Sequence, residues 1–120
     1  MAKNNLKSVK WREIKAPTSW RPEFGDELVG YYMGRTKKNG KFGQYEVVTV
    51  LVPYKGAMMC SGTMLIQLAD SAMLSAGDPI RIVYCGMKDL SEDRQMKTFK
   101  MFVGDGEALA EDQIPERYRS

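Results

Sequence analysis

The stretch 35–42 combines cations with an aromatic side chain. It holds Arg35, Lys37, Lys38, Lys41 and Phe42. The Asn-Gly pair at residues 39–40 favours positive φ angles and predicts a turn at that point. Cations can follow the phosphates of a polynucleotide, and an aromatic ring offers a face on which a base stacks. This stretch is therefore a candidate nucleic-acid-binding turn, and the alternative is a charged hairpin tip that blocks edge pairing.

Further candidates come from the alternation of side chains along the expected strands. It places Arg81, Lys100 and Phe102 outward, and it sends inward Ile80, Ile82, Tyr84, Phe99, Met101 and Val103. Either Tyr31 or Tyr32 can face outward, because a bulge at Gly30 would reverse their orientations. The predicted nucleic-acid-binding residues are Tyr31, Tyr32, Arg35, Lys37, Lys38, Lys41, Phe42, Tyr45, Tyr54, Lys55, Arg81, Lys97, Lys100 and Phe102.

Residue types that catalysis often needs are missing. The chain has no histidine, and its two cysteines, Cys60 and Cys85, lack the paired spacing of a zinc site. Neither a phosphate-binding glycine loop nor a nucleophile elbow is present. Acidic residues gather at 89–93, where a magnesium-dependent enzyme is the alternative to ordinary solvated charge. We expect no enzymatic activity, no cofactor, no metal site and two reduced cysteines, with a disulfide as the alternative state.

Charge is distributed unevenly along the 120 residues. Six basic residues stand against one acid in residues 1–21, whereas five acids stand against two arginines in residues 104–120. This distribution suggests a polyanionic partner, or else ordinary solubilising charge. We divide the chain into a basic arm (1–24), a folded domain (25–104) and an acidic flexible tail (105–120). Trp11 and Trp20 lie next to cations, and we expect them to anchor the arm rather than stack on bases.

The pattern of residues predicts five strands and one helix. Strands are expected over 26–35, 44–52, 57–63, 80–85 and 97–103. Apolar residues at helical spacing from Leu65 to Ala76 predict a helix, with Thr63 as its N-cap and Gly77 at its C-terminal end. A helix between the third and fourth of five strands is the order of the OB-fold. The expected fold class is therefore mainly all-β, a five-stranded OB-fold barrel with one short α-helix between strands 3 and 4.

Two segments resemble a known family. Residues 25–32 (GDELVGYY), the Lys/Gly turn and residues 76–82 (AGDPIRI) are similar to small OB-fold single-stranded DNA-binding proteins of bacteriophages. The resemblance covers residues 25–103 and implies binding of single strands. It does not extend to the C-terminus, because bacterial proteins of this class end in an acidic tip that finishes in Pro-Phe, whereas this chain ends in IPERYRS.

The expected function is binding of single-stranded DNA, or of RNA, with little sequence preference during replication, recombination or repair. The alternative is an OB-fold interaction module, such as a phage assembly or inhibitor protein, that grips another protein. The nine methionines are adaptable filler and are compatible with an interface in a homodimer or higher oligomer. No secretory signal or membrane-spanning run is recognisable, so we expect the cytoplasm of a bacterial host and no membrane partner.

Overall fold

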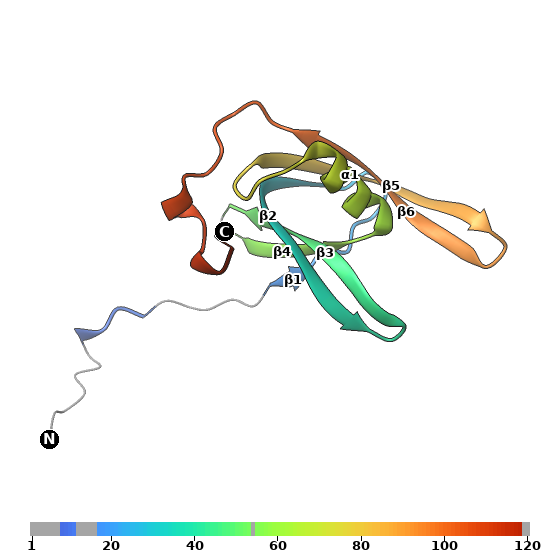
Figure 1. Cartoon of the computed structure of the whole chain (residues 1–120), viewed down its shortest axis with the longest axis horizontal. Helices are drawn as coiled ribbons and strands as arrows, with labels where there is room; N and C mark the ends of the chain where they lie inside the picture. The colour runs from blue at the N-terminus through green and yellow to red at the C-terminus, as the bar shows by residue number, and fades with distance from the viewer. Residues whose placement is uncertain (1–7, 12–16, 54, 119–120) are drawn as a thin grey trace, which may run out of the picture.

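The computed structural model describes residues 8–11, 17–53 and 55–118, and Figure 1 shows a twisted sheet with one short helix. The strands are β1 (Thr18–Ser19), β2 (Glu27–Gly40), β3 (Gly43–Val52), β4 (Gly56–Ser61), β5 (Pro79–Ser91) and β6 (Arg94–Val103). The helix α1 spans Thr63–Ala72, and the 3-10 turns η2 (Glu111–Gln113) and η3 (Glu116–Tyr118) follow β6. The predicted mainly β class with a short α-helix is confirmed.

One sheet contains all six strands in the order β1-β4-β3-β2-β5-β6. Neighbouring strands are antiparallel except β1, which pairs with β4 in parallel. The predicted five-stranded barrel is replaced by an open six-stranded sheet, because β1 adds a strand beside β4 and no described backbone ladder joins β6 to β4 or β1. Helix α1 connects β4 to β5.

The β2–β3 hairpin is longer than the sequence predicts. Its ladder continues to Gly40 opposite Gly43, so the turn is Lys41-Phe42 rather than Asn39-Gly40. In the core Tyr32 lies opposite Val50, and the register then shifts by one residue between Tyr32 and Gly34. Beyond this bulge the pairing is continuous to the turn, so the buried pair and the bulge together determine where the chain reverses.

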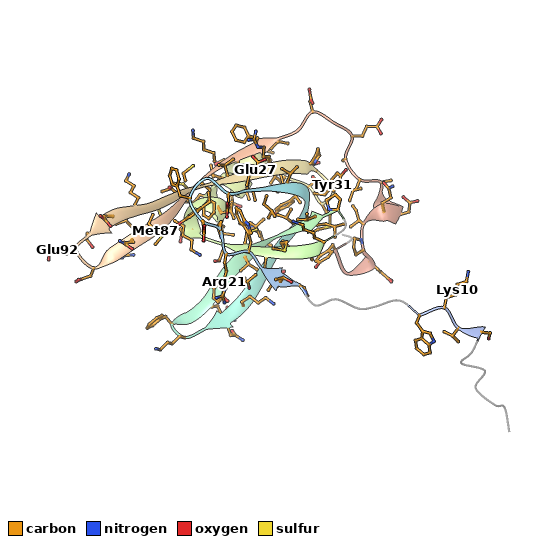
Figure 2. All side chains as sticks on the ribbon, turned by 180° about the vertical axis from the view of Figure 1, so that it is seen from behind. Lys10, Arg21, Glu27, Tyr31, Met87 and Glu92 are labelled. Carbon is orange, nitrogen blue, oxygen red and sulfur yellow. The ribbon has the colours of Figure 1, made fainter. Side chains whose placement is uncertain are left out.

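The β5–β6 hairpin is also extended. Its ladder runs to Ser91 opposite Arg94, so most of the segment 88–95, which lies between the expected strands 80–85 and 97–103, forms strand around the turn 92–93. A register shift at Cys85 bends β5 just before this extension. Figure 2 shows Met87 near the base of the projecting hairpin and Glu92 at its tip.

The core lies between the sheet and α1. Its fully buried side chains are Leu65, Ile82, Val48, Val50 and Cys60. The predicted inward residues Ile80, Ile82, Tyr84 and Phe99 are buried, and Met101 is half-buried. Val103 is exposed, contrary to its prediction. It is the last residue of β6, where the chain turns away from the core at Gly104.

Both ends of α1 differ from their predictions. Thr63 is the first helical residue, and the N-cap is Gly62, without a capping side chain. The helix ends at Ala72 because Met73 adopts the left-handed conformation at φ 53°. Gly77, the predicted C-terminal glycine, lies further on in the turn that leads to β5, where its N–H donates to the Tyr32 carbonyl (2.7 Å).

The segment that precedes β2 and the segment that follows β6 both contact the folded domain. Trp20 packs on Phe99, with 6.3 Å between the ring centroids, and the backbone N–H of Trp20 donates to the Met59 carbonyl (2.8 Å). At the other end Ile114 is buried, and the Leu109 N–H donates to the Gly77 carbonyl (3.0 Å). The expected domain boundaries stay predictions. Trp20 contacts the domain as the expected anchor would, whereas Trp11 is 75% exposed.

Candidate nucleic-acid interface

Tyr45 lies exposed on the β2–β3 hairpin, as the sequence suggested. A Cβ at Gly40 would approach its Cε1 atom to 2.9 Å, so the ring lies across a strand position that has no side chain. Lys38 is directly opposite Tyr45 in the ladder. The side chain remains 48% exposed. Because Gly40 has no side chain, the Tyr45 ring can lie across that position and keep an exposed surface that a base could contact.

Phe42 occupies the turn of the same hairpin. It is 96% exposed, and the Lys41 Nζ lies 5.9 Å from its ring centroid. Lys37, Lys38 and Lys41 form no ion pair with any residue that the structure describes. Such ammonium groups are available to an anion, and the aromatic ring beside them has no core to enter. The hairpin tip thus combines both components of a single-strand-binding surface.

Arg35 lies at the base of this hairpin and is held by two carboxylates. Its Nη1 is 2.7 Å from an Asp70 oxygen on α1, and its Nε is 3.5 Å from a Glu46 oxygen on β3. These ion pairs fix the hairpin against the helix. Compared with the three lysines, Arg35 is therefore less available to a phosphate.

Tyr32, also predicted as a binding residue, is instead a core residue. Burial raises the pKa of its hydroxyl; Arg35 partly opposes the shift, and Asp70 and Glu46 add to it. Its ring packs in the core cluster because the alternation that buries Leu28 continues without a shift to Tyr32, and the bulge comes only after it, between Tyr32 and Gly34. Tyr31 is half-buried, which agrees with the assignment that places Tyr32 inside.

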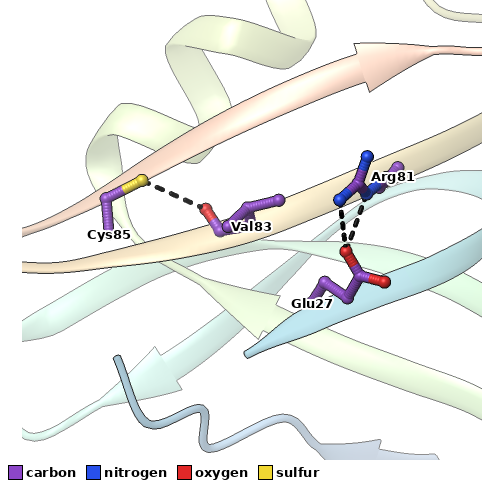
Figure 3. Close-up of polar contacts among 4 residues, drawn as sticks. All are labelled: Glu27, Arg81, Val83 and Cys85. Atoms are coloured by element: carbon purple, nitrogen blue, oxygen red, sulfur yellow. Dashed lines mark hydrogen bonds and ion pairs between the residues drawn. The ribbon is translucent and has the colours of Figure 1, made fainter. Parts of the chain in front are cut away.

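A second group of predicted residues lies on the outer face of β5 and β6. Arg81 Nη2 is 2.6 Å from Glu27 Oε2, and Figure 3 shows this ion pair. The Arg81 guanidinium also lies 5.4 Å from the ring centroid of Phe102, which is 47% exposed. Lys100 is exposed on the same strand. Arg81 is thus already neutralised by a carboxylate, which makes this group the poorer phosphate site.

The predicted residues do not form one continuous site. In the sheet register Arg81 lies opposite Val29 of β2, whereas Tyr45 lies opposite Lys38 of the same strand. Positions 29 and 38 are nine residues apart, which corresponds to roughly 30 Å along a strand. Among the other predicted residues, Lys97 donates to Ser61 Oγ (3.3 Å), Lys55 is exposed at the turn before β4, and Tyr54 lies outside the described residues.

A pocket of about 360 Å³ opens at the base of the β2–β3 hairpin. It is lined by Pro17, Met33, Arg35, Thr36, Lys38, Thr49, Met59 and Tyr118. Sequence reasoning identified only Arg35 and Lys38 among them. Tyr118 stands between two arginines in the sequence, the same pattern that drew attention to Trp11, but it falls in the segment interpreted as a flexible tail.

The two cysteines are free thiols, as expected. Burial raises the pKa of Cys60 to about 12, and nearby Lys97 opposes the shift to a smaller extent. Cys85 is half-buried, and its Sγ lies 3.7 Å from the Val83 carbonyl (Figure 3). Within residues 8–11, 17–53 and 55–118, no three acidic or cysteine side chains are grouped to hold a metal ion.

None of the helices in the described part of the chain has the length and apolar character needed to cross a membrane. No protein-family model, curated protein or solved structure matches this chain.

Proposed function

We propose that the protein binds single-stranded DNA with little sequence preference and that the β2–β3 hairpin is its principal contact. The observation that carries this proposal is the tip itself, where Phe42 is 96% exposed among lysines that have no described acidic partner. A ring exposed to this extent offers a face on which a base can stack. Tyr45 adds a second exposed ring on the same hairpin.

The order of the strands in the sheet supports the proposal. Apart from β1, the strand order β4-β3-β2-β5-β6 and the position of α1 between β4 and β5 suit the OB-fold. Lys97 on β6 donates to Ser61 on β4, and Phe99 lies against Gly62, which brings together the two strands that would close a barrel. OB-folds use the two projecting hairpins and the strands between them to bind oligonucleotides. The resemblance to phage single-stranded DNA-binding proteins is part of the same proposal.

Two physical effects would contribute to binding. The lysines would replace counterions condensed on the phosphates, so affinity should fall steeply as salt rises. Each base that stacks on an aromatic ring contributes about 1–3 kcal/mol without regard to its identity. Neither effect reads base edges, which explains why little sequence preference is expected.

The first test is fluorescence anisotropy of a labelled dT oligonucleotide, titrated with the full chain at low and moderate salt. We expect micromolar or tighter binding at low salt, a steep loss with added salt and weak binding of duplex DNA. The same titrations with an oligo-U strand compare DNA with RNA. Absence of binding at low salt would overturn the proposal.

Alanine variants at the aromatic residues locate the contact. Phe42→Ala and Tyr45→Ala should each weaken oligonucleotide binding about five- to 150-fold, the range expected for one lost stacking contact. Met73→Ala is the matched control, since Met73 is exposed after the end of α1 and lies on neither projecting hairpin. All three variants should unfold at the same urea concentration as the wild type. If Met73→Ala weakens binding as much as Phe42→Ala, the assignment of the contact to the β2–β3 hairpin is wrong.

The alternative function is a protein-interaction module, and one observation favours it. Phe24 in the turn before β2, Val29 on β2 and Phe102 on β6 are exposed, and β6 is an open edge of the sheet. A partner protein could cover this apolar surface. Such binding should be insensitive to salt and unaffected by Phe42→Ala, which separates it experimentally from the leading proposal.

A further inference from the structure

The pocket at the base of the β2–β3 hairpin is built from segments that are distant in the sequence. Met33 and Thr49 come from the centre of the sheet, Met59 comes from β4, and Tyr118 comes from the C-terminal segment. Its volume of about 360 Å³ lies within the range of small-molecule sites, roughly 300–1,000 Å³. The hairpin that carries the exposed aromatic residues begins at its rim, where Lys38 contributes to the wall.

The lining offers three kinds of contact. Met33 and Met59 supply polarisable apolar surface, which favours contact with flat aromatic rings. Thr49, only 3% exposed, supplies a polar group at a buried position. Lys38 supplies an ammonium group that has no described ion-pair partner. A ligand that is flat and apolar at one end and anionic at the other matches this set.

The C-terminal segment forms a fixed wall of the pocket. Ile114 is buried beside Gly77, where a Cβ would come within 3.2 Å of its Cδ1 atom. The Leu109 N–H donates to the Gly77 carbonyl (3.0 Å), which ties the start of this segment to the same turn. Tyr118 follows in η3, where its N–H donates to the Pro115 carbonyl (2.8 Å). The pocket keeps its volume with Tyr118 in the wall, so this residue borders the site rather than filling it.

We propose that this pocket holds one nucleotide of the bound strand, with its base against Tyr118 and the two methionines and its phosphate on Lys38. This inference rests on the proposed function and deepens it, because it assigns a fixed subsite that lies apart from the hairpin tip. The strand would pass from Phe42 along the hairpin to the pocket. The C-terminal segment thereby becomes part of the binding surface instead of a solubilising tail.

Methionine methyl NMR tests the proposal directly. The full chain is labelled with ¹³C at methionine methyl groups, and the resonances are assigned with Met33→Leu and Met59→Leu variants. Addition of a dT oligonucleotide should shift the Met33 and Met59 resonances saturably, at the concentration that anisotropy gives for binding. Met73, which is exposed after the end of α1, is the internal control and should not shift.

Variants at the wall give a second readout. Tyr118→Ala should weaken oligonucleotide binding about five- to 150-fold, and Tyr118→Phe should retain most of the affinity because the ring remains. Lys38→Gln should weaken binding without changing the urea midpoint. If the wild type binds the oligonucleotide but Met33 and Met59 do not shift, the pocket is not a subsite although the proposed function stands.

Two other outcomes would also overturn the inference. Tighter binding by Tyr118→Ala would show that the C-terminal segment competes with the strand. Absence of any binding by the wild type in the anisotropy titration would remove the proposed function, and the subsite with it.

Discussion

Cys60 is a residue whose environment can be tested without any ligand. Its side chain is fully buried between strand and helix, and burial raises the pKa of the thiol from 9.0 to about 12. A thiolate in this position would lie in apolar surroundings with little solvation. The folded protein therefore binds the thiol proton more tightly than the unfolded chain does.

This difference predicts a loss of stability in alkaline solution. The contribution of the neutral thiol is fully present below about pH 9 and is lost as the pH rises toward 12. Each pH unit in that window lowers the free energy of unfolding by up to about 1.4 kcal/mol. Urea denaturation at about pH 7 and pH 10 should show a steeper loss for the wild type than for Cys60→Ala. Equal losses in the two proteins would show that the thiol titrates normally in the folded state.

At the scale of elements, the junction between β4 and α1 depends on Gly62. This residue has φ +149°, and a Cβ would lie 2.8 Å from the Phe99 ring on β6. The glycine therefore allows the chain to leave the strand, start the helix and let an aromatic side chain approach. All three requirements meet at one position, which fixes the helix against β6.

Gly62→Ala should destabilise the protein by about 2 kcal/mol, because backbone strain adds to a clash with a buried ring. The measurement is the urea midpoint of unfolding. Gly106→Ala is the matched control, since nothing lies within 4 Å of the Cβ that it would add. A Gly62→Ala protein as stable as this control would mean that the junction can relax.

Local pattern predicted the elements better than it predicted where they end. The alternation around Ile80, Ile82 and Phe99 gave the correct inward face, because one side of these strands meets the core. The Asn39-Gly40 turn was misplaced because the register at the tip follows from the Tyr32–Val50 pairing, a contact between distant residues, and from the register shift between Tyr32 and Gly34. For the same reason the pocket was missed, as no local signal connects Tyr118 with Thr49.

At the scale of the whole molecule, a formal net charge of +3 could by itself attract DNA. A general attraction of this kind would not depend on which cations are removed, whereas direct phosphate contacts would. If only the total charge matters, removal of any three cations should have the same effect. If the β2–β3 hairpin makes the contacts, its lysines should count for more than others.

Two triple variants with the same charge separate these cases. One carries Lys37→Gln, Lys38→Gln and Lys41→Gln, and the other carries Lys7→Gln, Lys10→Gln and Arg21→Gln at positions outside the predicted contacts, so each has a formal net charge of 3 − 3 = 0. For single strands, log K falls with log salt by about 0.7 per phosphate contacted, so loss of three contacts should flatten the slope by about 2. We expect this change in anisotropy titrations of the hairpin triple and a much smaller one in the other. Equal slopes for the two triples would mean that the molecule attracts DNA through its overall charge, and the β2–β3 hairpin would then have no special role in phosphate binding.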